Sequence, residues 1–207
     1  MTEIDRSKMH PLIVSIDLEF NQPIKRIIQI GCVIGDLTTG QVVDRFSIFI
    51  NPAEALAPEI VKLCGIKQAD VDSAPDIKEA YRQLTLWLKP YAGQRCLNPL
   101  TWGGGDSEDL RLALAMDRED RDTWVIGRRW LDVKAVYIAW RAAHQRPGDG
   151  GLARSMSKLG LAFRGRRHNA LDDAENTFAV YVALLKQFQP ELVLTAASHN
   201  VPKRQRP

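Results

Sequence analysis

The chain has 207 residues, of which 45% are hydrophobic and 26% are charged, and its formal net charge is +3. This composition is that of an ordinary globular protein with enough residues for one α/β domain, and no apolar run approaches membrane-spanning length. The mildly basic balance, with a pI of about 8.8, permits a nucleic-acid partner without requiring one.

Three strands are predicted in the first fifty residues. Residues 12–20, 27–34 and 41–50 are apolar and rich in β-branched side chains, and short links join them. The link at Thr38, Thr39 and Gly40 has the composition of a hairpin turn. We therefore expect an antiparallel meander at one side of a mixed sheet.

The rest of the chain alternates helical patterns with short strand patterns. Strands are predicted over 96–102 and 129–132; helices are predicted over 57–63, 76–89, 106–116, 132–144, 152–159 and 169–188. The first of these helices should end at Gly65 and the second at Pro90, and Asp132 should cap its helix. The order βββα, βα, βα argues for one α/β domain, with a mixed sheet of about five strands and helices on both faces.

The ends of the chain and its cysteines point to an intracellular protein. Residues 1–10 are polar, are expected to be flexible and contain no signal-like apolar stretch, so we expect a cytoplasmic protein with no membrane partner. Cys32, Cys64 and Cys96 form no Cys-x-x-Cys pair and have no spacing typical of a zinc site, so they are predicted to be buried free thiols. Residues 190–207 are expected to form a flexible basic tail, which can touch phosphates but is more simply a solvated end.

The first candidate site is the pair Asp17 and Glu19 in the first predicted strand. Residues i and i+2 of a strand share a face, so both carboxylates should emerge together near its end. Two like charges side by side are unfavourable unless a cation joins them, and oxygen ligands suit Mg²⁺ or Mn²⁺. A solvated strand end is the alternative, since Asp-x-Glu alone is common.

The second candidate is Asp106, which follows a strand and three glycines in the segment TWGGGD. A strand, a glycine turn and an acid that starts a helix can bring a carboxylate into a cleft. The same position is favoured for an acid merely by helix capping and the helix dipole. Asp109 lies one turn further on and competes for the same role.

The third candidate is the pair His168 and Asp173 in the segment HNALDDA. A histidine just before a helix and an aspartate within its first turns can face one site, and the small Ala170 between them allows close packing. Asp172 points elsewhere and serves as a first-turn acid. A lone histidine is more often a surface residue than a catalyst.

Taken together and in this order, the three motifs resemble those of the DEDD exonuclease superfamily. Its members carry Asp-x-Glu on the first strand, a central Asp after a later strand, and His-x-Ala-x-x-Asp on a late helix. The matching residues are Asp17, Glu19, Asp106, His168 and Asp173. The sibling subtype has Tyr where this chain has Asn169, so the histidine subtype is favoured.

The resemblance runs from about residue 12 to residue 188 and places an exonuclease domain over 11–189. IIQIGCVI, LCGI and TWGGGD resemble further family segments, the last of them the Trp-Gly motif of the RNA-processing branch that includes enhancer-of-RNAi exonucleases. The resemblance implies a ribonuclease-H-like fold and 3′→5′ exonuclease activity on single-stranded nucleic acid, with RNA favoured. Phe20 and Asn21 stand where many members have Thr beside the 3′-terminal nucleotide, and Gln29 stands where many have Glu.

The resemblance also implies a two-metal hydrolysis that releases nucleoside 5′-monophosphates. Two Mg²⁺ or Mn²⁺ ions, about 4 Å apart, would be held by the carboxylates. The residues concerned are Asp17, Glu19, Asp106 and Asp173. His168 would act as general base, because imidazole is the side chain that ordinarily titrates near neutral pH.

Five residues are candidates for contacting the substrate. Leu18, Phe20, Ile66 and Trp102 come from segments that the family places beside the carboxylates, where they can stack or wedge against terminal bases. Core packing explains Ile66 and Trp102 equally well. Arg167, with Arg164 and Arg166, can grip phosphates, although loop arginines are as often simply solvated.

Three alternatives remain open from the sequence. The first is a DNA exonuclease of the proofreading type with the same chemistry. The second is a nucleic-acid-binding module that has kept the fold and lost catalysis, which the presence of all five expected side chains argues against. The third is a structural or regulatory protein that uses the domain for docking. The sequence names neither the physiological substrate nor a protein partner.

Overall fold

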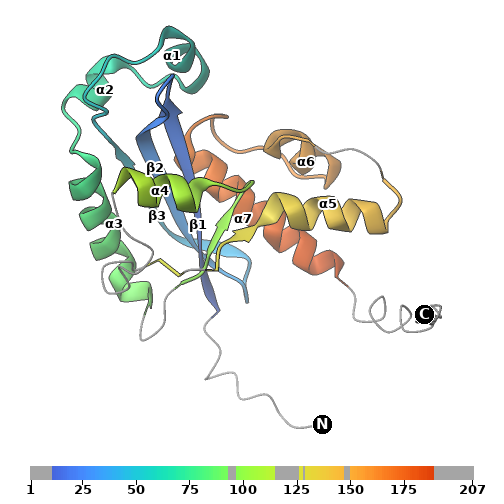
Figure 1. Ribbon diagram of the computed structural model, residues 1–207. Helices are drawn as coiled ribbons and strands as arrows, with labels where there is room; N and C mark the ends of the chain where they lie inside the picture. Colours follow the sequence, from blue (N-terminus) through green and yellow to red (C-terminus); the bar gives the residue numbers. More distant parts are fainter. Residues whose placement is uncertain (1–10, 93–96, 115–125, 128, 147–149, 189–207) are drawn as a thin grey trace, which may run out of the picture.

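The computed structural model describes residues 11–92, 97–114, 126–127, 129–146 and 150–188 (Figure 1). Five strands lie in this part of the chain: β1 Leu12–Asn21, β2 Arg26–Asp36, β3 Gln41–Phe49, β4 Pro99–Thr101 and β5 Leu131–Asp132. The helices are α1 Pro58–Cys64, α2 Gln68–Asp72, α3 Ile77–Ala92, α4 Asp106–Ala113, α5 Val133–Ala143, α6 Leu152–Lys158 and α7 Ala170–Gln187. Residues 1–10 and 190–207, and Cys96, lie outside the described residues, so the predictions made for them stay predictions.

The strands form one mixed sheet in the order β3-β2-β1-β4-β5. β1 pairs antiparallel with β2, and β2 pairs antiparallel with β3, as the short links between them require. β4 pairs in parallel with β1, and β5 pairs in parallel with β4, each after a helical connection. The predicted α/β class, with a meander at one side of a five-stranded sheet, is confirmed.

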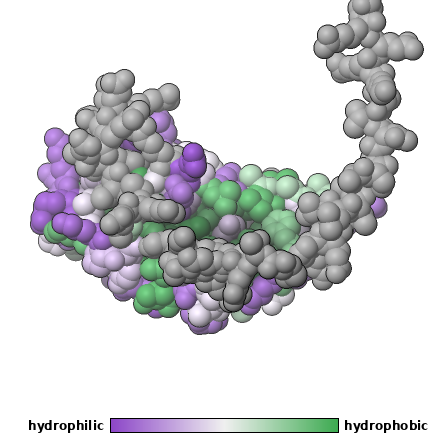
Figure 2. Space-filling view, turned by 90° about the horizontal axis from the view of Figure 1, so that it is seen from below, coloured by the Kyte–Doolittle hydropathy of each residue, from purple (hydrophilic) through white to green (hydrophobic). Residues whose placement is uncertain are grey.

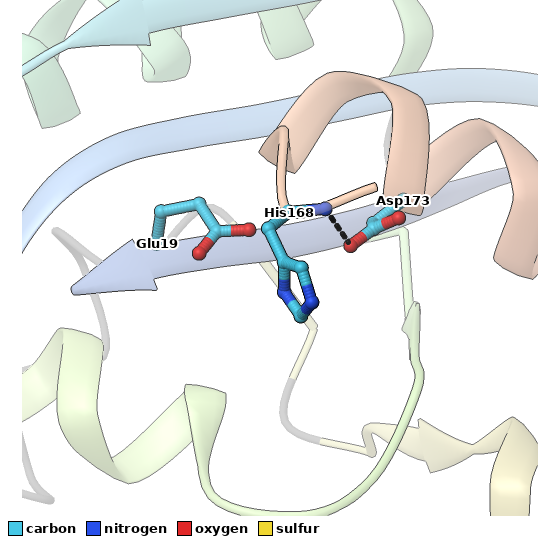
Figure 3. Close-up of side chains that lie close together, drawn as sticks. All are labelled: Glu19, His168 and Asp173. Atoms are coloured by element: carbon cyan, nitrogen blue, oxygen red, sulfur yellow. Dashed lines mark hydrogen bonds between the residues drawn. The ribbon is translucent and has the colours of Figure 1, made fainter. Parts of the chain in front are cut away.

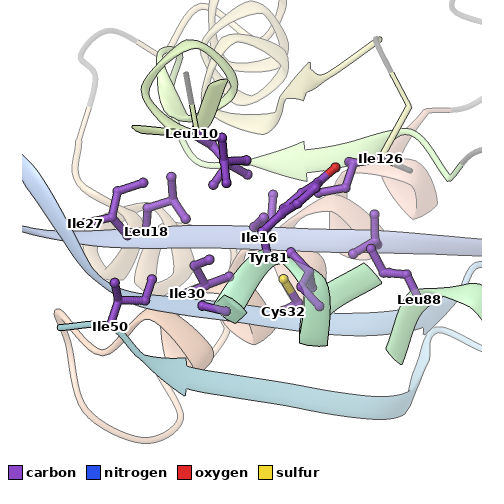
Figure 4. Packing of buried hydrophobic residues seen from close by; sticks show 14 of the residues in the cluster. Ile16, Leu18, Ile27, Ile30, Cys32, Ile50, Tyr81, Leu88, Leu110 and Ile126 are labelled. Atoms are coloured by element: carbon purple, nitrogen blue, oxygen red, sulfur yellow. The ribbon is translucent and has the colours of Figure 1, made fainter. Parts of the chain in front are cut away.

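Helices cover both faces of this sheet (Figure 1). On one face α3 and α4 pack over a cluster that includes Ile16, Ile30, Leu84 and Leu110 (Figure 4). On the other face α5, α6 and α7 enclose a second cluster, which contains Tyr137, Met156 and Phe178 among others. Because β1 contributes every second residue to the first cluster, the residues between them point toward α7.

The helices α1 and α2 close the end of the sheet at which β1 finishes. They bury a small third cluster with Ile28, Ile60, Cys64 and Val71 among its members. Gly65 ends α1 with a φ of 70°, a left-handed conformation that glycine adopts without strain, so the predicted helix stop is confirmed.

Some predicted boundaries are wrong. The helix α3 does not stop at Pro90 but continues through it to Ala92. Proline removes one helical hydrogen bond, and here side chains near the helix end compensate. The Trp87 indole and the Tyr91 hydroxyl both donate to Asp44 of β3, at 2.9 and 2.5 Å. These bonds hold the last turn of α3 against the sheet.

Other differences concern short elements. The five-residue helix α2 was not predicted; it begins where the Lys67 N–H donates to Asp70 Oδ2 at 2.7 Å. The strands β4 and β5 are shorter than expected, with three and two residues. Pro99 opens β4, a position that tolerates the missing N–H. Asp132 caps α5, as predicted, by accepting the Ala135 N–H at 3.1 Å.

Two further expectations concern cysteines and membranes. Cys32 and Cys64 are free and buried, as predicted. Within the described ranges, no helix has both the length and the apolar character needed to cross a membrane. Figure 2 shows, from below, apolar side chains in the middle of one face and polar ones at its edge. Apolar atoms make up much of any protein surface, so no site follows from this face alone.

Candidate active site

The strand β1 presents Asp17 and Glu19 on the face that α7 covers. In the antiparallel register Asp17 lies opposite Gly31 of β2, and Glu19 lies opposite Gln29. The register shifts between Glu19 and Phe20, a bulge of the kind that often re-aims side chains next to active sites. Glu19 is only 9% exposed. The alternation of the strand therefore brings both carboxylates to one face, with Glu19 largely removed from water.

The start of α7 lies directly on β2 at Gly31. A Cβ atom on Gly31 would lie 2.1 Å from the Ala170 carbonyl carbon and from the Leu171 nitrogen, so only a hydrogen fits there. The Ala170 N–H donates to Gln29 Oε1 at 3.1 Å, and the Gln29 amide donates to Ser47 Oγ at 3.1 Å. Gln29 and Gly31 thus fix the first turn of α7 beside the carboxylates of β1.

His168 precedes α7 in a left-handed conformation, with a φ of 60°. Its N–H donates to Asp173 Oδ2 at 3.2 Å, and its side chain is exposed. Glu19, His168 and Asp173 offer potential ligand atoms within 4.8 Å of one another. Figure 3 shows Glu19 reaching from β1 toward the histidine and aspartate at the start of α7.

The loop before His168 is tied to α7 by two side chains. Asp172 accepts the Arg166 N–H at 2.7 Å. The buried Asn176 amide donates to the Arg164 carbonyl at 2.8 Å and to the Asp172 carbonyl at 2.7 Å, while its oxygen accepts the Arg164 N–H at 3.1 Å. The loop that carries the histidine is therefore fixed to the helix that carries Asp173.

Asp106 is the first residue of α4, and it lies outside the group of ligand atoms formed by Glu19, His168 and Asp173. The turn before it needs glycine, because φ is 102° at Gly103 and 118° at Gly105. Asp109, the competing acid, accepts a hydrogen bond from Lys25 at 2.6 Å. Lys25 is thus bonded to Asp109, and its charge also lowers the pKa of Asp106 against the larger effect of burial. The charge of Asp106 in turn raises the pKa values of Asp17 and Glu19.

The carboxyl groups perturb one another's ionisation. Burial, followed by the charges of Asp173, Glu19 and Asp106, raises the pKa of Asp17 well above its ordinary value. Burial is also the main cause that raises the pKa of Glu19 to about 7, and those of Asp106 and Asp173 to about 6. A divalent cation would relieve this cost, and carboxylate oxygens are the ligands that Mg²⁺ and Mn²⁺ prefer. The donor set therefore fits such ions.

Cys64 bonds directly to this cluster and was not identified as a site residue from the sequence. Its thiol donates to Glu19 Oε2 at 3.2 Å, and burial raises the pKa of Cys64 to about 12, so the thiol keeps its proton. The bond lowers the pKa of Glu19 against the larger effect of burial. The only signal in the sequence was its position in the LCGI segment.

The residues expected to contact substrate differ in how far their side chains are exposed to solvent. The side chains of Leu18 and Ile66 are buried, at 5% and 3% exposure, and Leu18 faces the α3 side of the sheet. Phe20 is half-buried, with Lys25 Nζ 4.9 Å from its ring centroid. Trp102 is half-buried and packs on Tyr137, with ring centroids 6.0 Å apart.

Arg167 is exposed, and its guanidinium carbon lies 6.0 Å from the ring centroid of Phe163. Of the five expected substrate residues, Phe20, Trp102 and Arg167 have surface available to a ligand.

Comparison with known families and proteins yields a consistent match. The family model RNase_T, described as exonuclease, matches residues 14–181. ERI1 exoribonuclease 2 of Mus musculus is 27% identical over 172 residues, which cover 73% of this chain and 24% of that protein. The 3′-5′ exonuclease Snipper of Drosophila melanogaster is 28% identical over 176 residues, covering 77% of this chain and 61% of Snipper. The chain thus spans about a quarter of the former relative and less than two thirds of the latter.

Solved structures share the fold. The nuclease domain of 3′hExo, a DEDDh family member bound to rAMP, matches with a TM-score of 0.72 at 20% identity, covering 87% of this chain and 94% of that domain. Cell-death related nuclease 4 (CRN-4) matches with a TM-score of 0.74 at 16% identity, over 86% of this chain and 64% of that one. The ribonuclease-H-like arrangement expected from the sequence is confirmed.

Proposed function

Since the chain belongs to the exonuclease family, we propose that it is a metal-dependent 3′→5′ exonuclease that hydrolyses phosphodiester bonds at the 3′ end of single-stranded nucleic acid. Its products would be nucleoside 5′-monophosphates. The Asn at position 169 and the His at position 168 are those of the histidine subtype of the DEDD superfamily. RNA is the favoured substrate, a preference supported by the names of relatives such as the ERI1 exoribonucleases.

One observation carries the proposal: acidic side chains distant in sequence share one site with a histidine. Glu19, His168 and Asp173 offer ligand atoms within 4.8 Å of one another. The charges of Glu19, Asp106 and Asp173 act on Asp17, and those of Asp106 and Asp173 act on Glu19. Clusters of carboxylates with raised pKa values are unfavourable in a folded protein and are typical of functional sites.

The four carboxylates would hold the metal, and we propose two Mg²⁺ or Mn²⁺ ions. The residues concerned are Asp17, Glu19, Asp106 and Asp173. When bound, divalent ions would lower the pKa of a water molecule and would stabilise the charge on the leaving 3′ oxygen. The Cys64 thiol contributes by donating to Glu19 Oε2 at 3.2 Å, which leaves the other oxygen of that carboxylate free to ligate.

His168 would take the proton from the attacking water. Its imidazole is exposed at the edge of the carboxylates, and its backbone is fixed by the bond to Asp173. General-base catalysis of this kind contributes about 10²–10⁴-fold to rate. Phe20 and Trp102 would contact the terminal nucleoside, and Arg167 a phosphate, while Leu18 and Ile66 would form the buried apolar support behind it.

The family match over 14–181 supports an exonuclease domain that extends over residues 11–189. A fragment with these boundaries should keep the thermal stability and the activity of the full chain. A fragment that unfolds at a lower temperature would show that the flanking residues belong to the folded unit.

The activity is tested with 5′-labelled single-stranded RNA and DNA of the same sequence, incubated with Mg²⁺, Mn²⁺ or EDTA. A ladder that shortens from the 3′ end, requires metal and disappears in Asp17→Ala supports the proposal. The ratio of the RNA rate to the DNA rate gives the substrate preference, and a higher DNA rate would favour the proofreading type. No ladder on either strand with either metal would reject the proposal in favour of a binding module.

Asp106 and Asp109 provide a matched pair for the same assay. Asp106→Ala should abolish the ladder, because it removes a carboxylate from the cluster. Asp109→Ala should keep it, because that carboxylate is engaged with Lys25 at the edge of the site. The reverse result would assign the central acid to Asp109.

A further inference from the structure

A cavity of about 470 Å³ opens beside the carboxylates, on the side of α5 and α6. His168 and Asp173 form part of its wall, so the cavity is continuous with the proposed reaction centre. The lining also includes Lys134 from the first turn of α5 and Arg154 from α6. Arg167, one residue before the histidine, completes the lining with a third positive charge. Three separate segments of the chain therefore bring cations to one cavity.

Within the described part of the chain, none of these three cations has a carboxylate partner. No ion pair or hydrogen bond joins Lys134, Arg154 or Arg167 to an acidic side chain among the residues that the structure describes. Asp173 supplies a carboxylate to the lining, and the charge of Arg167 lowers the pKa of that group against the effect of burial. By contrast, Arg45 of β3, which does not line this cavity, is paired with Glu175 of α7 at 2.7 Å. The cavity is thus lined by a local excess of positive charge.

Unpaired lysine and arginine side chains converging on one cavity are suited to phosphate groups. The inference that follows rests on the proposed function. At a 3′ end, the scissile phosphate is the last phosphate of the strand, and every other phosphate lies on its 5′ side. A second phosphate site next to the reaction centre must therefore hold the part of the strand that is retained after cleavage.

We propose that Lys134, Arg154 and Arg167 bind the internucleotide phosphates on the 5′ side of the scissile bond. The strand would leave the reaction centre between α5 and α6, and the terminal nucleoside would lie on the opposite side, toward Phe20. Phosphate contacts of this kind carry no base sequence information, so the site serves RNA and DNA alike. The cavity would make affinity depend on the length of the strand.

The first test measures binding without hydrolysis. Fluorescence anisotropy of a labelled single-stranded dodecamer in EDTA gives Kd at several salt concentrations. On a single strand, each phosphate that a cation neutralises contributes about 0.7 to the slope of log K against log salt, so Lys134→Ala/Arg154→Ala should reduce the slope by about 1.4. Kd at low salt should rise at least tenfold.

The control is Lys78→Ala/Lys158→Ala, which removes the same net charge. Lys78 lies exposed on α3 and Lys158 lies exposed on α6, and neither lines the cavity. This variant should keep the wild-type slope within about 0.4. An equal reduction of the slope in the two double variants would overturn the proposal, because it would show an effect of net charge alone. An unchanged slope in Lys134→Ala/Arg154→Ala would overturn it as well.

The second test uses two substrates. The p-nitrophenyl ester of a nucleoside 5′-monophosphate has the scissile phosphate and the terminal nucleoside but no strand on the 5′ side. The ratio of kcat/KM for the dodecamer to kcat/KM for this ester should fall at least tenfold in Lys134→Ala/Arg154→Ala. A constant ratio would overturn the assignment of the cavity. Failure of the wild type to hydrolyse either substrate would instead reject the proposed function, and the binding slope would still decide the cavity.

Discussion

His168 occupies a backbone conformation that is uncommon for a residue with a side chain. Its φ of 60° turns the chain from the arginine-rich loop into α7, and the N–H bond to Asp173 stabilises the turn. Such conformations persist where the surrounding structure fixes them, and they cluster at functional sites. Here Asp172 and Asn176 fix the loop from the helix side. The backbone contacts of this loop therefore position the imidazole, which makes no hydrogen bond to the side chains or backbone that the structure describes.

We expect His168→Ala to lower kcat by roughly 10²–10⁴, because it removes the proposed general base. Metal binding, measured by titration calorimetry with Mn²⁺, should change little, since the carboxylates remain. His144→Ala is the control, because His144 lies at the end of α5 and bonds to the Trp140 carbonyl. Activity within twofold of the wild type would contradict the role given to His168.

Cys64 should tune metal binding through Glu19. In Cys64→Ala the carboxylate loses a donor that lowers its pKa, so protons compete better with metal for Glu19. The Mg²⁺ concentration for half-maximal activity at pH 7 should rise about tenfold, the size of effect seen for partners of metal ligands. Cys64→Ser should recover most of the loss, because a hydroxyl can donate the same bond. Equal effects of Ala and Ser would show that packing, and not the hydrogen bond, matters.

The sequence indicated the acidic residues but not their supports. Strand alternation is a local property, so it placed Asp17 and Glu19 on one face of β1 before any register was known. The roles of Gln29 and Cys64 depend on which residues of β2 and α1 end up beside Glu19. That information lies in contacts between distant segments, which a single sequence does not show.

At the scale of elements, the site depends on how closely α7 approaches β2. Gly31 has no room for a methyl group, since the atoms a Cβ would meet are backbone atoms of Ala170 and Leu171. Backbone cannot rotate away as a side chain can, so α7 would have to shift. His168 and Asp173, which flank that contact, would move with it. The close backbone contact at Gly31 thus sets the position of both proposed active-site residues.

Gly31→Ala should therefore lower both stability and activity. We expect a loss of about 1–3 kcal/mol in the free energy of unfolding, as for other overpacked positions, and a fall in kcat greater than the folded fraction explains. Urea unfolding followed by circular dichroism measures the first quantity. Gly104→Ala is the control, since a Cβ there would meet nothing within 4 Å. A stable, fully active Gly31→Ala protein would show that α7 is not fixed by this contact.

Long, periodic elements were predictable, and short ones were not. The strands β1 to β3 and the helix α7 matched their patterns, because burial of one face dictates the sequence over many residues. The end of α3 was wrong because Trp87 and Tyr91 bond to Asp44 across 43 and 47 residues, and these tertiary bonds outweigh the signal of Pro90. The strand β5, with two residues, is defined by its pairing with β4 alone.

At the scale of the whole molecule, the acidic cluster makes folding depend on pH. Glu19 has an ordinary pKa of 4.5 and a pKa of about 7 in the folded protein. The folded protein consequently binds more protons than the unfolded chain between these values, and its stability falls as pH rises through them. Asp106 and Asp173, raised to about 6, act in the same direction. The pKa of Glu79 is lowered from 4.5 to about 2, so this group changes the stability only below pH 4.5, outside the range in which Glu19 titrates.

Without metal, the wild type should therefore unfold at a lower temperature at pH 7.5 than at pH 5. Glu19→Gln removes one titrating group, so its advantage over the wild type in the free energy of unfolding should grow from about 1 kcal/mol at pH 5 to about 3 kcal/mol at pH 7.5. Mg²⁺ should stabilise the wild type more at pH 7.5, where the carboxylates are ionised, than at pH 5. Differential scanning calorimetry in EDTA and in Mg²⁺ measures all three quantities. The contrary outcome is a metal-free protein whose stability rises from pH 5 to pH 7.5 and does not increase with Mg²⁺. That result would mean that the protein's own cations already neutralise the carboxylates. The proposed metal site would then have to be abandoned.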